Sequence, residues 1–311
     1  MTLRAFRSFA KVNLGLEVVR LLPEGYHELR TLFATLSLHD IVEFRPRRRG
    51  IVVRTDHPDV PDGPTNLAWR AAEAMQRLSG RRSGIDITVH KRIAAGGGLG
   101  GGSSNAATVL RALNRIWNAN IDPARLHEAA AALGADVPYF LVGGPALGLG
   151  RGDDIHPIDL SLQGRVLLVQ GPGGVSTGEV FRAYGATRGA FSSPSRIEPF
   201  LKQRRAGPAG TSLLGRLRND LEAAAISVSA PLRRTARAVR QAGTRNGAIF
   251  AAMSGSGSSF FLVFEHADAR KAAARDLRAL GHHAVACAFV SRSAFERRFE
   301  ITKPGKTARV R

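Results

Sequence analysis

Residues 96–105 read GGGLGGGSSN, with six glycines in seven positions, then two serines and an asparagine. Upstream, IDITV at 85–89 alternates apolar and polar residues with the period of a half-buried strand. Downstream, apolar residues within 103–118 recur every three or four positions, which predicts a helix. The glycines therefore lie between a strand and a helix N-terminus, where free N–H groups and missing Cβ atoms suit a phosphate. A flexible linker is the alternative interpretation of this composition.

The glycine spacing does not fit two common phosphate loops. Gly96 to Gly101 satisfy G-x-G-x-x-G, but a dinucleotide fold also needs a second strand that ends in an acidic residue near position 120. Asp122 instead precedes proline and an alanine-rich stretch, which is typical of a helix N-cap. Gly102-Ser103 stands where a Walker motif needs Lys-Ser or Lys-Thr. We expect Ser103, Ser104 or Asn105 to cap the helix that follows the loop.

Length and composition indicate an ordinary globular protein. The 311 residues, 44% of them hydrophobic, are enough for two domains. The single cysteine, Cys287, excludes an intrachain disulfide, fits a reducing cytosol and is interpreted as a core residue. Residues 1–13 lack the apolar stretch of a secretion signal, so a cytoplasmic protein is expected. Residues 129–150 come closest to a membrane span, but an aspartate, two prolines and five glycines make membrane insertion unfavourable.

The chain is strongly basic, with 45 Lys and Arg against 25 Asp and Glu, a net charge of +20. This balance favours nucleic acid, anionic membranes or polyanionic small substrates as partners. The basic runs at 45–49, 202–205 and 303–311 lack the interleaved aromatic residues of single-strand binders, which argues against nucleic acid. We interpret these runs as solvated surface and expect residues 301–311 to form a disordered tail.

Strands and helices mix in both halves of the chain, which predicts a two-domain α+β protein. The first half is expected to contain strands near 3–9, 13–19, 41–45, 51–54 and 85–89 and helices near 67–79, 103–118 and 123–133. The second half is expected to contain strands at 166–170 and 284–290, two apolar runs around Ser-Gly-Ser-Gly at 254–257, and helices near 177–185, 217–226, 231–242 and 268–281. Residues 187–212 are expected to be a surface loop.

Several motifs together resemble the GHMP small-molecule kinases. In order they are KVNLGLEV, GYHELRTLF, GGGLGGGSSNAA, LGADVPYFL, GVSTGEVF, NDLE and MSGSGSS, between Lys11 and Phe264. The glycine loop is shared by the whole superfamily. GYHEL together with LGADVP resembles one branch, whose substrate is a cytidine-diphosphate-linked methylerythritol of the non-mevalonate isoprenoid pathway.

The resemblance implies a fold and a reaction. The fold would be an N-terminal domain like domain 2 of ribosomal protein S5, assigned to 1–160, and a ferredoxin-like C-terminal domain, assigned to 161–300, with the site between them. The reaction would be transfer of the ATP γ-phosphate to the 2-hydroxyl of the polyol, with Mg²⁺ as the cofactor of ATP. The partners would be ATP and this substrate, without a membrane, in a monomer or a homodimer.

The resemblance also implies site residues. Lys11 and Asp136 would be the catalytic pair, and no protein metal ligand is assigned. The cytidine-linked substrate would be bound by Asn13, Tyr26, His27, Phe33, Gly255 and Ser256. The nucleotide would be bound by Ala95, Gly96, Gly97, Gly98, Leu99, Gly100, Gly101, Gly102, Ser103, Ser104, Asn105 and Asn66.

Each site residue also has a structural interpretation. Asp136 could cap a helix that begins at Pro138, and Lys11 could lie on an exposed strand face. His27 could be a loop residue bonded to backbone, and Phe33 an ordinary core residue. Ser-Gly-Ser-Gly at 254–257 could be a simple hairpin turn or a second corner for an anion. Two rival functions stay open: a homoserine or mevalonate kinase, and an RNA-binding protein.

Overall fold

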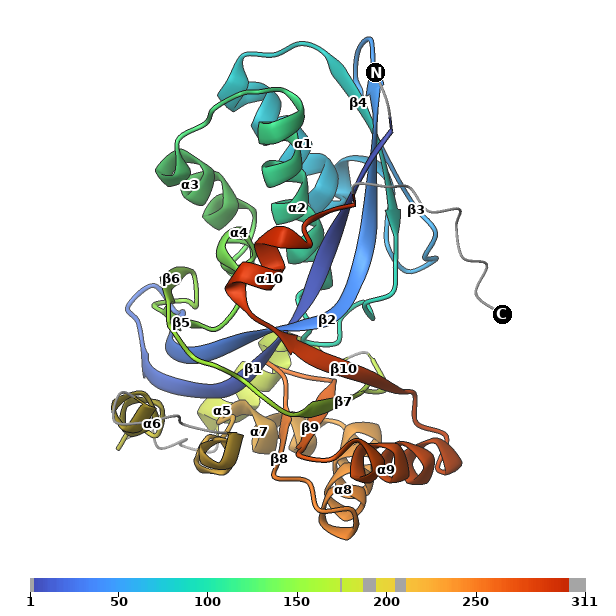
Figure 1. The fold of residues 1–311 in the computed structure, drawn as a ribbon. Helices are drawn as coiled ribbons and strands as arrows, with labels where there is room; N and C mark the ends of the chain where they lie inside the picture. The colour runs from blue at the N-terminus through green and yellow to red at the C-terminus, as the bar shows by residue number, and fades with distance from the viewer. Residues whose placement is uncertain (1–2, 174, 187–193, 205–210, 302–311) are drawn as a thin grey trace.

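The computed structural model contains two halves of mixed strands and helices, drawn one above the other in Figure 1. Its description covers residues 3–173, 175–186, 194–204 and 211–301. A long antiparallel hairpin, β1 (Arg4–Leu21) and β2 (His27–Arg47), runs from the first half toward the second. The expected two-domain α+β architecture is confirmed.

The hairpin is longer than the sequence predicted. β1 is one continuous strand where two were expected, and β2 begins 14 residues before the expected strand at 41–45. The register of the pair shifts beside Lys11 and Asn13. These irregularities, and the buried polar residues next to them, interrupt the alternation from which strands are predicted.

The sheet of the first half is built around β2. β4 (Gly84–His90) pairs antiparallel with β2 and parallel with β3 (Ile51–Thr55). On the other part of β2, β5 (Ala146–Leu149) pairs antiparallel and is followed by β6 (Asp154–Pro157). Four helices lie on one side of this sheet in Figure 1: α1 (Leu67–Ser79), α2 (Gly101–Ile116), α3 (Pro123–Leu133) and α4 (Tyr139–Val142). Together these helices and the sheet enclose one apolar core.

The second half has the order of a ferredoxin-like sheet. Its strands β7 (Arg165–Val169), β8 (Phe250–Met253), β9 (Phe260–Phe264) and β10 (Ala284–Val290) are arranged β10-β7-β9-β8, all antiparallel. The helices are α5 (Thr177–Ala186), α7 (Leu221–Val228), α8 (Ala230–Arg245) and α9 (Ala267–Ala279). The two strand–helix–strand units match the expectation for this half.

The two halves share a continuous sheet, and the chain returns to the first half at its end. Phe289 and Val290 of β10 pair with β2, which joins the two sheets. α10 (Arg292–Arg297) then leads to β11 (Glu300–Ile301), which pairs with β1. The boundary at 160/161 therefore stays a prediction, and the last residues of the assigned C-terminal domain belong to the first sheet.

Two expectations for irregular segments change. Within the described part of 187–212, residues Ile197–Arg204 form helix α6, and Thr211 begins the short 3-10 helix η2 (Thr211–Arg216). Ile301 is part of β11, whereas the rest of the expected tail, 302–311, lies outside the described residues. The sequence did not predict α6, because the segment 187–212 is mostly polar and its few apolar residues give a weak periodic signal.

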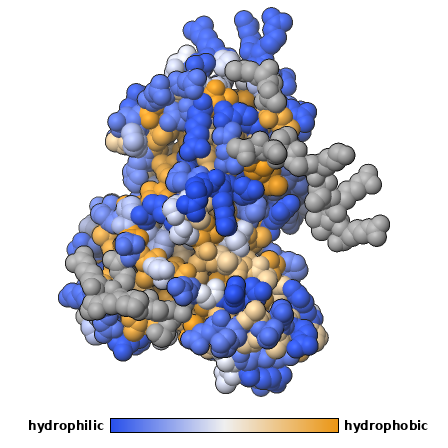
Figure 2. Space-filling model, in the orientation of Figure 1, coloured by the Kyte–Doolittle hydropathy of each residue, from blue (hydrophilic) through white to orange (hydrophobic). Residues whose placement is uncertain are grey.

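The candidate membrane segment is divided among short elements. Residues 129–150 contain the end of α3, the helix α4 and the strand β5. Among the described residues, no helix has both the length and the apolar character needed to cross a membrane. Figure 2 shows hydrophilic residues over most of one face, with apolar residues gathered near its middle.

Candidate active site

The glycine loop runs from β4 to α2, and its carbonyl groups are bound by the rest of the protein. Four consecutive carbonyl oxygens, from Gly97 to Gly100, accept hydrogen bonds of 2.8–3.1 Å. The donors, in order, are Ser259 N, Ser254 Oγ, Lys11 N and Ser104 N. Because the N–H of each trans peptide points opposite to its carbonyl, the N–H groups of residues 98–101 point away from these donors. Such N–H groups beside a helix N-terminus suit an anion.

The glycines are also required by the backbone and by packing. Gly96, Gly98 and Gly100 have positive φ values of 66°, 74° and 69°. A Cβ on Gly98 would lie 2.2 Å from the carbonyl oxygen of Ser254, closer than any real contact. We expected the glycines of the loop to leave room for phosphate. At Gly101, however, a Cβ would point toward the protein interior, where it would lie 3.0 Å from Ile93. Close packing therefore explains this glycine.

The start of α2 corrects the capping prediction. The helix begins at Gly101, and Gly100 at the N-cap position makes no side-chain capping bond. Ser104 and Asn105 lie inside the first turns and bond to Ser8 of β1, with Ser8 Oγ donating to Ser104 Oγ at 2.8 Å and Asn105 Nδ2 donating to Ser8 Oγ at 2.8 Å. The first N–H groups of α2 are therefore not consumed by a side-chain cap.

Asn66 is the N-cap residue of α1, and both ends of its side-chain amide are hydrogen-bonded to the backbone. Its Oδ1 accepts from Ala68 N at 2.9 Å, and its Nδ2 donates to Pro61 O at 2.7 Å. Asn66 is next to Leu67, which is the nearest side chain to a Cβ built on Gly102. Its place near the loop fits a nucleotide contact, which stays a prediction.

Lys11 lies on β1 beside the glycine loop and is buried, with 3% of its side chain exposed. Its Nζ donates to Asn13 Oδ1 at 2.7 Å and lies 3.3 Å from Asp136 Oδ2. The Phe33 ring lies beneath the ammonium group, 5.5 Å from Nζ to the ring centre. The exposed strand-face interpretation of Lys11 is therefore wrong.

Asp136 does not act as a helix cap. α4 has Pro138 at its N-cap position and no side-chain capping bond. The Asp136 side chain is 37% exposed, in contrast to its buried partner Lys11. A carboxylate that is fixed by an ammonium group on one side and open on the other can accept a proton from a bound alcohol.

The Ser-Gly-Ser-Gly segment joins β8 and β9 and faces the loop. Asn219 Nδ2 donates to Gly255 O at 2.6 Å, and a Cβ on Gly255 would lie 3.4 Å from Asn13 Oδ1 and 3.5 Å from Lys11 Nζ. Ser256 Oγ lies 2.8 Å from Thr177 Oγ1 at the start of α5. The segment is thus a hairpin connection and also a wall beside Lys11.

Three of the residues predicted to bind the cytidine-linked substrate, Tyr26, His27 and Phe33, lie in two places. Tyr26 is 58% exposed before β2, with the Arg151 guanidinium 5.5 Å from its ring centre. Phe33 is buried, and its ring lies 4.6 Å from that of Tyr139. His27 and Phe33 are six residues apart on one strand, about 20 Å at the usual rise of a strand. Tyr26 and Phe33 therefore do not form the two sides of one base pocket.

Sequence reasoning missed the aromatic partners of His27. Its ring stacks on Phe181 of α5 at 4.8 Å with an interplanar angle of 24°, and it meets Tyr184 edge-on at 6.4 Å. Partial burial at this point lowers the pKa of His27, which favours the neutral imidazole. The helix α5 was expected, but nothing in the sequence marks which of its rings faces the hairpin tip.

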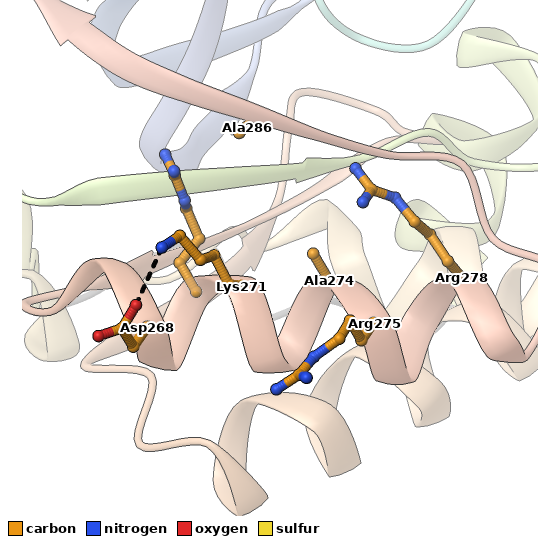
Figure 3. Close-up of a pocket in the computed structure, with 7 residues that line it drawn as sticks. Asp268, Lys271, Ala274, Arg275, Arg278 and Ala286 are labelled. Atoms are coloured by element: carbon orange, nitrogen blue, oxygen red, sulfur yellow. Dashed lines mark hydrogen bonds and ion pairs between the residues drawn. The ribbon is translucent and has the colours of Figure 1, made fainter.

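A cavity lies elsewhere, against α9. Its volume is about 530 Å³, and Figure 3 shows mainly basic side chains around it, with Lys271 paired to Asp268. Its lining residues are Asp268, Arg270, Lys271, Ala274, Arg275, Arg278 and Ala286. None of the predicted site residues that the structure describes lines this cavity. We therefore place the candidate active site at the glycine loop, where buried charge and free N–H groups meet.

Comparison with known proteins decides the family. The family model for the GHMP kinases N terminal domain matches residues 66–144, and the model for the GHMP kinases C terminal domain matches 199–283. A 4-diphosphocytidyl-2-C-methyl-D-erythritol kinase from Pelotomaculum thermopropionicum is 37% identical over 86% of this chain and 91% of its own length. The chain belongs to the GHMP kinase family, in the branch of these relatives.

Other relatives agree with this membership. The enzyme of the same name from Nocardia farcinica is 38% identical over 88% of this GHMP kinase and 89% of its own chain. A crystal structure of 4-(cytidine 5'-diphospho)-2C-methyl-D-erythritol kinase superposes with a TM-score of 0.75 and 36% identity, covering 92% of this chain and 98% of the other. A homoserine kinase from Cytophaga hutchinsonii, at 19% identity and a TM-score of 0.69, shares the fold.

The described part of this GHMP kinase shows no metal cage of its own. Among the described residues, no three His, Cys, Asp or Glu side chains lie close enough to hold a metal ion. Mg²⁺ usually binds one or two carboxylates and completes its shell with substrate phosphates and water. The sequence assigns no protein ligand to Mg²⁺, and Asp136, which is paired with Lys11, is kept here as the candidate proton acceptor.

Proposed function

We propose that this chain transfers the γ-phosphoryl group of ATP to the 2-hydroxyl group of 4-diphosphocytidyl-2-C-methyl-D-erythritol, a step in the non-mevalonate route to isoprenoid precursors. The observation that carries the proposal is the contact of 3.3 Å between Lys11 Nζ and Asp136 Oδ2 beside the glycine loop. The membership of the chain in the branch of the 4-diphosphocytidyl-2-C-methyl-D-erythritol kinases supports the choice of substrate.

The glycine loop and the start of α2 would bind the phosphates of ATP. Phosphoryl transfer depends mainly on positioning and on charge stabilisation. The N–H groups of residues 98–101 and the positive end of α2 supply both without a side chain. Mg²⁺ would neutralise phosphate charge when bound with ATP.

Lys11 and Asp136 would act on the acceptor alcohol. The Asp136 carboxylate would take the hydroxyl proton as the new P–O bond forms, and Lys11 would hold this carboxylate in place. The Lys11 ammonium would also oppose the negative charge that develops near the transferred group. Asn13, bonded to both Lys11 and Thr31, would orient the polyol.

The aromatic cluster at the hairpin tip would bind the cytosine. Tyr26 and the stacked pair of His27 and Phe181 offer flat surfaces to a base and one ring nitrogen to its polar edge. Gly255 and Ser256 connect this cluster to the catalytic pair. Ser256 contacts Thr177 at the start of α5, the helix that carries Phe181, and Gly255 lies beside Asn13 and Lys11. The arrangement suits a substrate long enough to reach from the tip to Lys11.

A substrate panel tests the proposal. Purified protein with Mg-ATP is offered the cytidylylated methylerythritol, free methylerythritol, homoserine and mevalonate, and ADP release is measured. We expect turnover of the first compound only, with the Asp136→Asn variant as the control for contaminating kinases. Equal turnover of the free polyol would contradict the cytidine-specific site. Salt-sensitive retention of RNA without any turnover would favour the rival nucleic-acid function.

The remaining assignments are part of the same proposal. The cytoplasm fits a chain with one buried cysteine, Cys287. Domain limits of 1–160 and 161–300 fit the two matched family models, which lie on either side of the boundary. Size-exclusion chromatography with light scattering would distinguish a monomer from a homodimer.

A further inference from the structure

A second buried ion pair lies behind the glycine loop, outside the catalytic pair. Asp40 on β2 is completely buried, and Lys91, just after β4, has 3% of its side chain exposed. Lys91 Nζ donates to Asp40 Oδ2 at 2.5 Å. The same oxygen accepts from Asn105 Nδ2 at 2.9 Å.

The other carboxylate oxygen holds the entrance to the loop. Asp40 Oδ1 accepts from the backbone N–H of Arg92 at 2.7 Å and of Ile93 at 2.8 Å. Ile93 is three residues before Gly96. One carboxylate therefore fixes the chain that enters the loop and, through Asn105, the helix that leaves it.

The cluster reaches the catalytic strand as well. Ser8, on β1 three residues before Lys11, is completely buried, donates to Ser104 and accepts from Asn105. Lys91 Nζ itself lies under the first turn of α2, since a Cβ on Gly101 would be 3.1 Å from it. The four side chains Ser8, Asp40, Lys91 and Asn105 thus connect β1, β2, the loop entrance and α2.

A buried ion pair is weak support for stability, because removing two charges from water offsets much of their attraction. Its value here is geometric. A loop of glycines has no side chains to hold its shape, and its backbone is freer than that of any other sequence. Its shape must therefore be imposed at its ends, and Asp40 binds both ends with four hydrogen bonds.

We propose that Asp40 is a positioning residue that preorganises the glycine loop for ATP through its bonds to residues 91–93 and Asn105. This rests on the proposed function of the loop. Asp40 acts through the loop entrance and through Asn105 of α2, and it has no hydrogen bond or ion pair with Lys11 or Asp136. Its loss should therefore weaken nucleotide binding and leave acceptor binding unchanged.

The test compares Asp40→Asn with the wild type. Asparagine keeps an oxygen for the N–H groups of Arg92 and Ile93 but turns an amide N–H₂ toward two donors, Lys91 and Asn105. We expect the Kd of a non-hydrolysable ATP analogue, measured by calorimetry without acceptor, to rise roughly 10- to 100-fold, as expected for a misplaced site. KM for ATP should rise in parallel, and KM for the acceptor should stay within twofold.

Glu296→Gln is the matched control. Glu296 pairs at 2.7 Å with Arg111, a buried guanidinium on the same helix α2. This variant loses a charge pair that packs the chain end, so it should lower the melting temperature and leave the Kd of the analogue unchanged. A similar Kd for folded Asp40→Asn and the wild type would overturn the proposal, and so would equal increases in the KM of ATP and acceptor.

Ser8→Ala covers the case in which Asp40→Asn fails to fold. It removes one hydroxyl of the same cluster without an unpaired charge, and a two- to tenfold rise in the Kd of the analogue is expected. An unchanged Kd for folded Ser8→Ala would then overturn the proposal. Wild-type protein that binds the analogue but phosphorylates no cytidylylated polyol would contradict the proposed function alone, since the binding comparison needs no acceptor.

Discussion

Lys11 and Asp136 form an ion pair of unequal exposure: the ammonium group is 3% exposed, and the carboxylate 3.3 Å away is 37% exposed. The buried cation is fixed by Asn13 and by the Phe33 ring. The open carboxylate is therefore held in position while it stays accessible to an alcohol. This asymmetry is what the proposed transfer of a proton to Asp136 requires.

Replacing Asp136 by asparagine should abolish most of the activity. The amide keeps the shape but cannot take the alcohol proton, so kcat should fall by roughly 10²–10⁴-fold with little change in ATP affinity. Steady-state kinetics and calorimetry with an ATP analogue provide the measurement. Asp122→Asn is the control, because Asp122 caps α3 and asparagine caps equally well. Near-wild-type kcat for Asp136→Asn would exclude the base assignment.

Replacing Lys11 by methionine should lower kcat by roughly 10²–10³-fold, the usual loss when a preorganised charge is removed from a transition state. The variant leaves Asn13 Oδ1 without its donor at 2.7 Å, so the melting temperature should also fall. Stopped assays and differential scanning calorimetry would measure both effects. A folded Lys11→Met with normal kcat would show that the ion pair is only structural.

Alanine at Gly98 and at Gly102 should have opposite effects on stability. Gly98 has φ +74° and no room for a Cβ, so alanine should lower the free energy of unfolding by about 1–3 kcal/mol or more. Gly102 lies in the first turn of α2 with only Leu67 at 3.6 Å from its Cβ position, so alanine should stabilise by about 0.5–1 kcal/mol. Thermal melts of the two variants would compare them directly. Equal melting temperatures would contradict the close packing of the loop against Ser254.

Phe181→Leu should affect the acceptor and not the nucleotide. The Phe181 ring stacks on His27 and would offer a flat surface to the cytosine. An aromatic pair contributes about 0.5–1.5 kcal/mol beyond the burial of its surface, so loss of this ring should raise the KM of the cytidylylated substrate roughly two- to tenfold. The KM of ATP should stay unchanged in the same assay. A rise in both constants would indicate a general disturbance of α5.

The protonation of His27 should control acceptor binding at acid pH. Burial lowers its pKa below the ordinary 6.5, so as pH falls the unfolded chain takes up the proton before the folded one. The contribution of the neutral ring to stability is therefore complete above pH 6.5 and is lost as pH falls from there through the folded-state pKa. NMR titration should give a value below 6.5, and a His27→Gln variant should lose this part of the pH dependence of KM. A pKa above 6.5 would contradict the prediction.

The sequence predicted the loop and the order of elements better than the site contacts. The alternation of 85–89 and the spacing within α2 are local patterns, so both elements are found almost where expected. The two roles open to Asp136 could be separated only by the fold, because its distance to Lys11 depends on where the turn between α3 and α4 lies relative to β1.

Long-range contacts account for the errors. Tyr26 and Phe33, both predicted to bind the cytidine-linked substrate, are near in sequence, but an extended strand separates them. Phe181 is far from His27 in sequence and becomes its neighbour only when α5 packs on the hairpin tip. Asp40 reads as an ordinary polar residue in a strand, and its four donors come from segments distant in the sequence.

The pairing of β11 with β1 has a consequence for synthesis of the chain. Ala5 and Phe6 of the first strand meet Ile301 and Glu300 of the last, and Phe6 also packs on Phe299. During translation, the outer edge of β1 and the side of the Phe6 ring that contacts Phe299 stay uncovered until residues 299–301 have been synthesised. The half that is made first is therefore the half that is finished last.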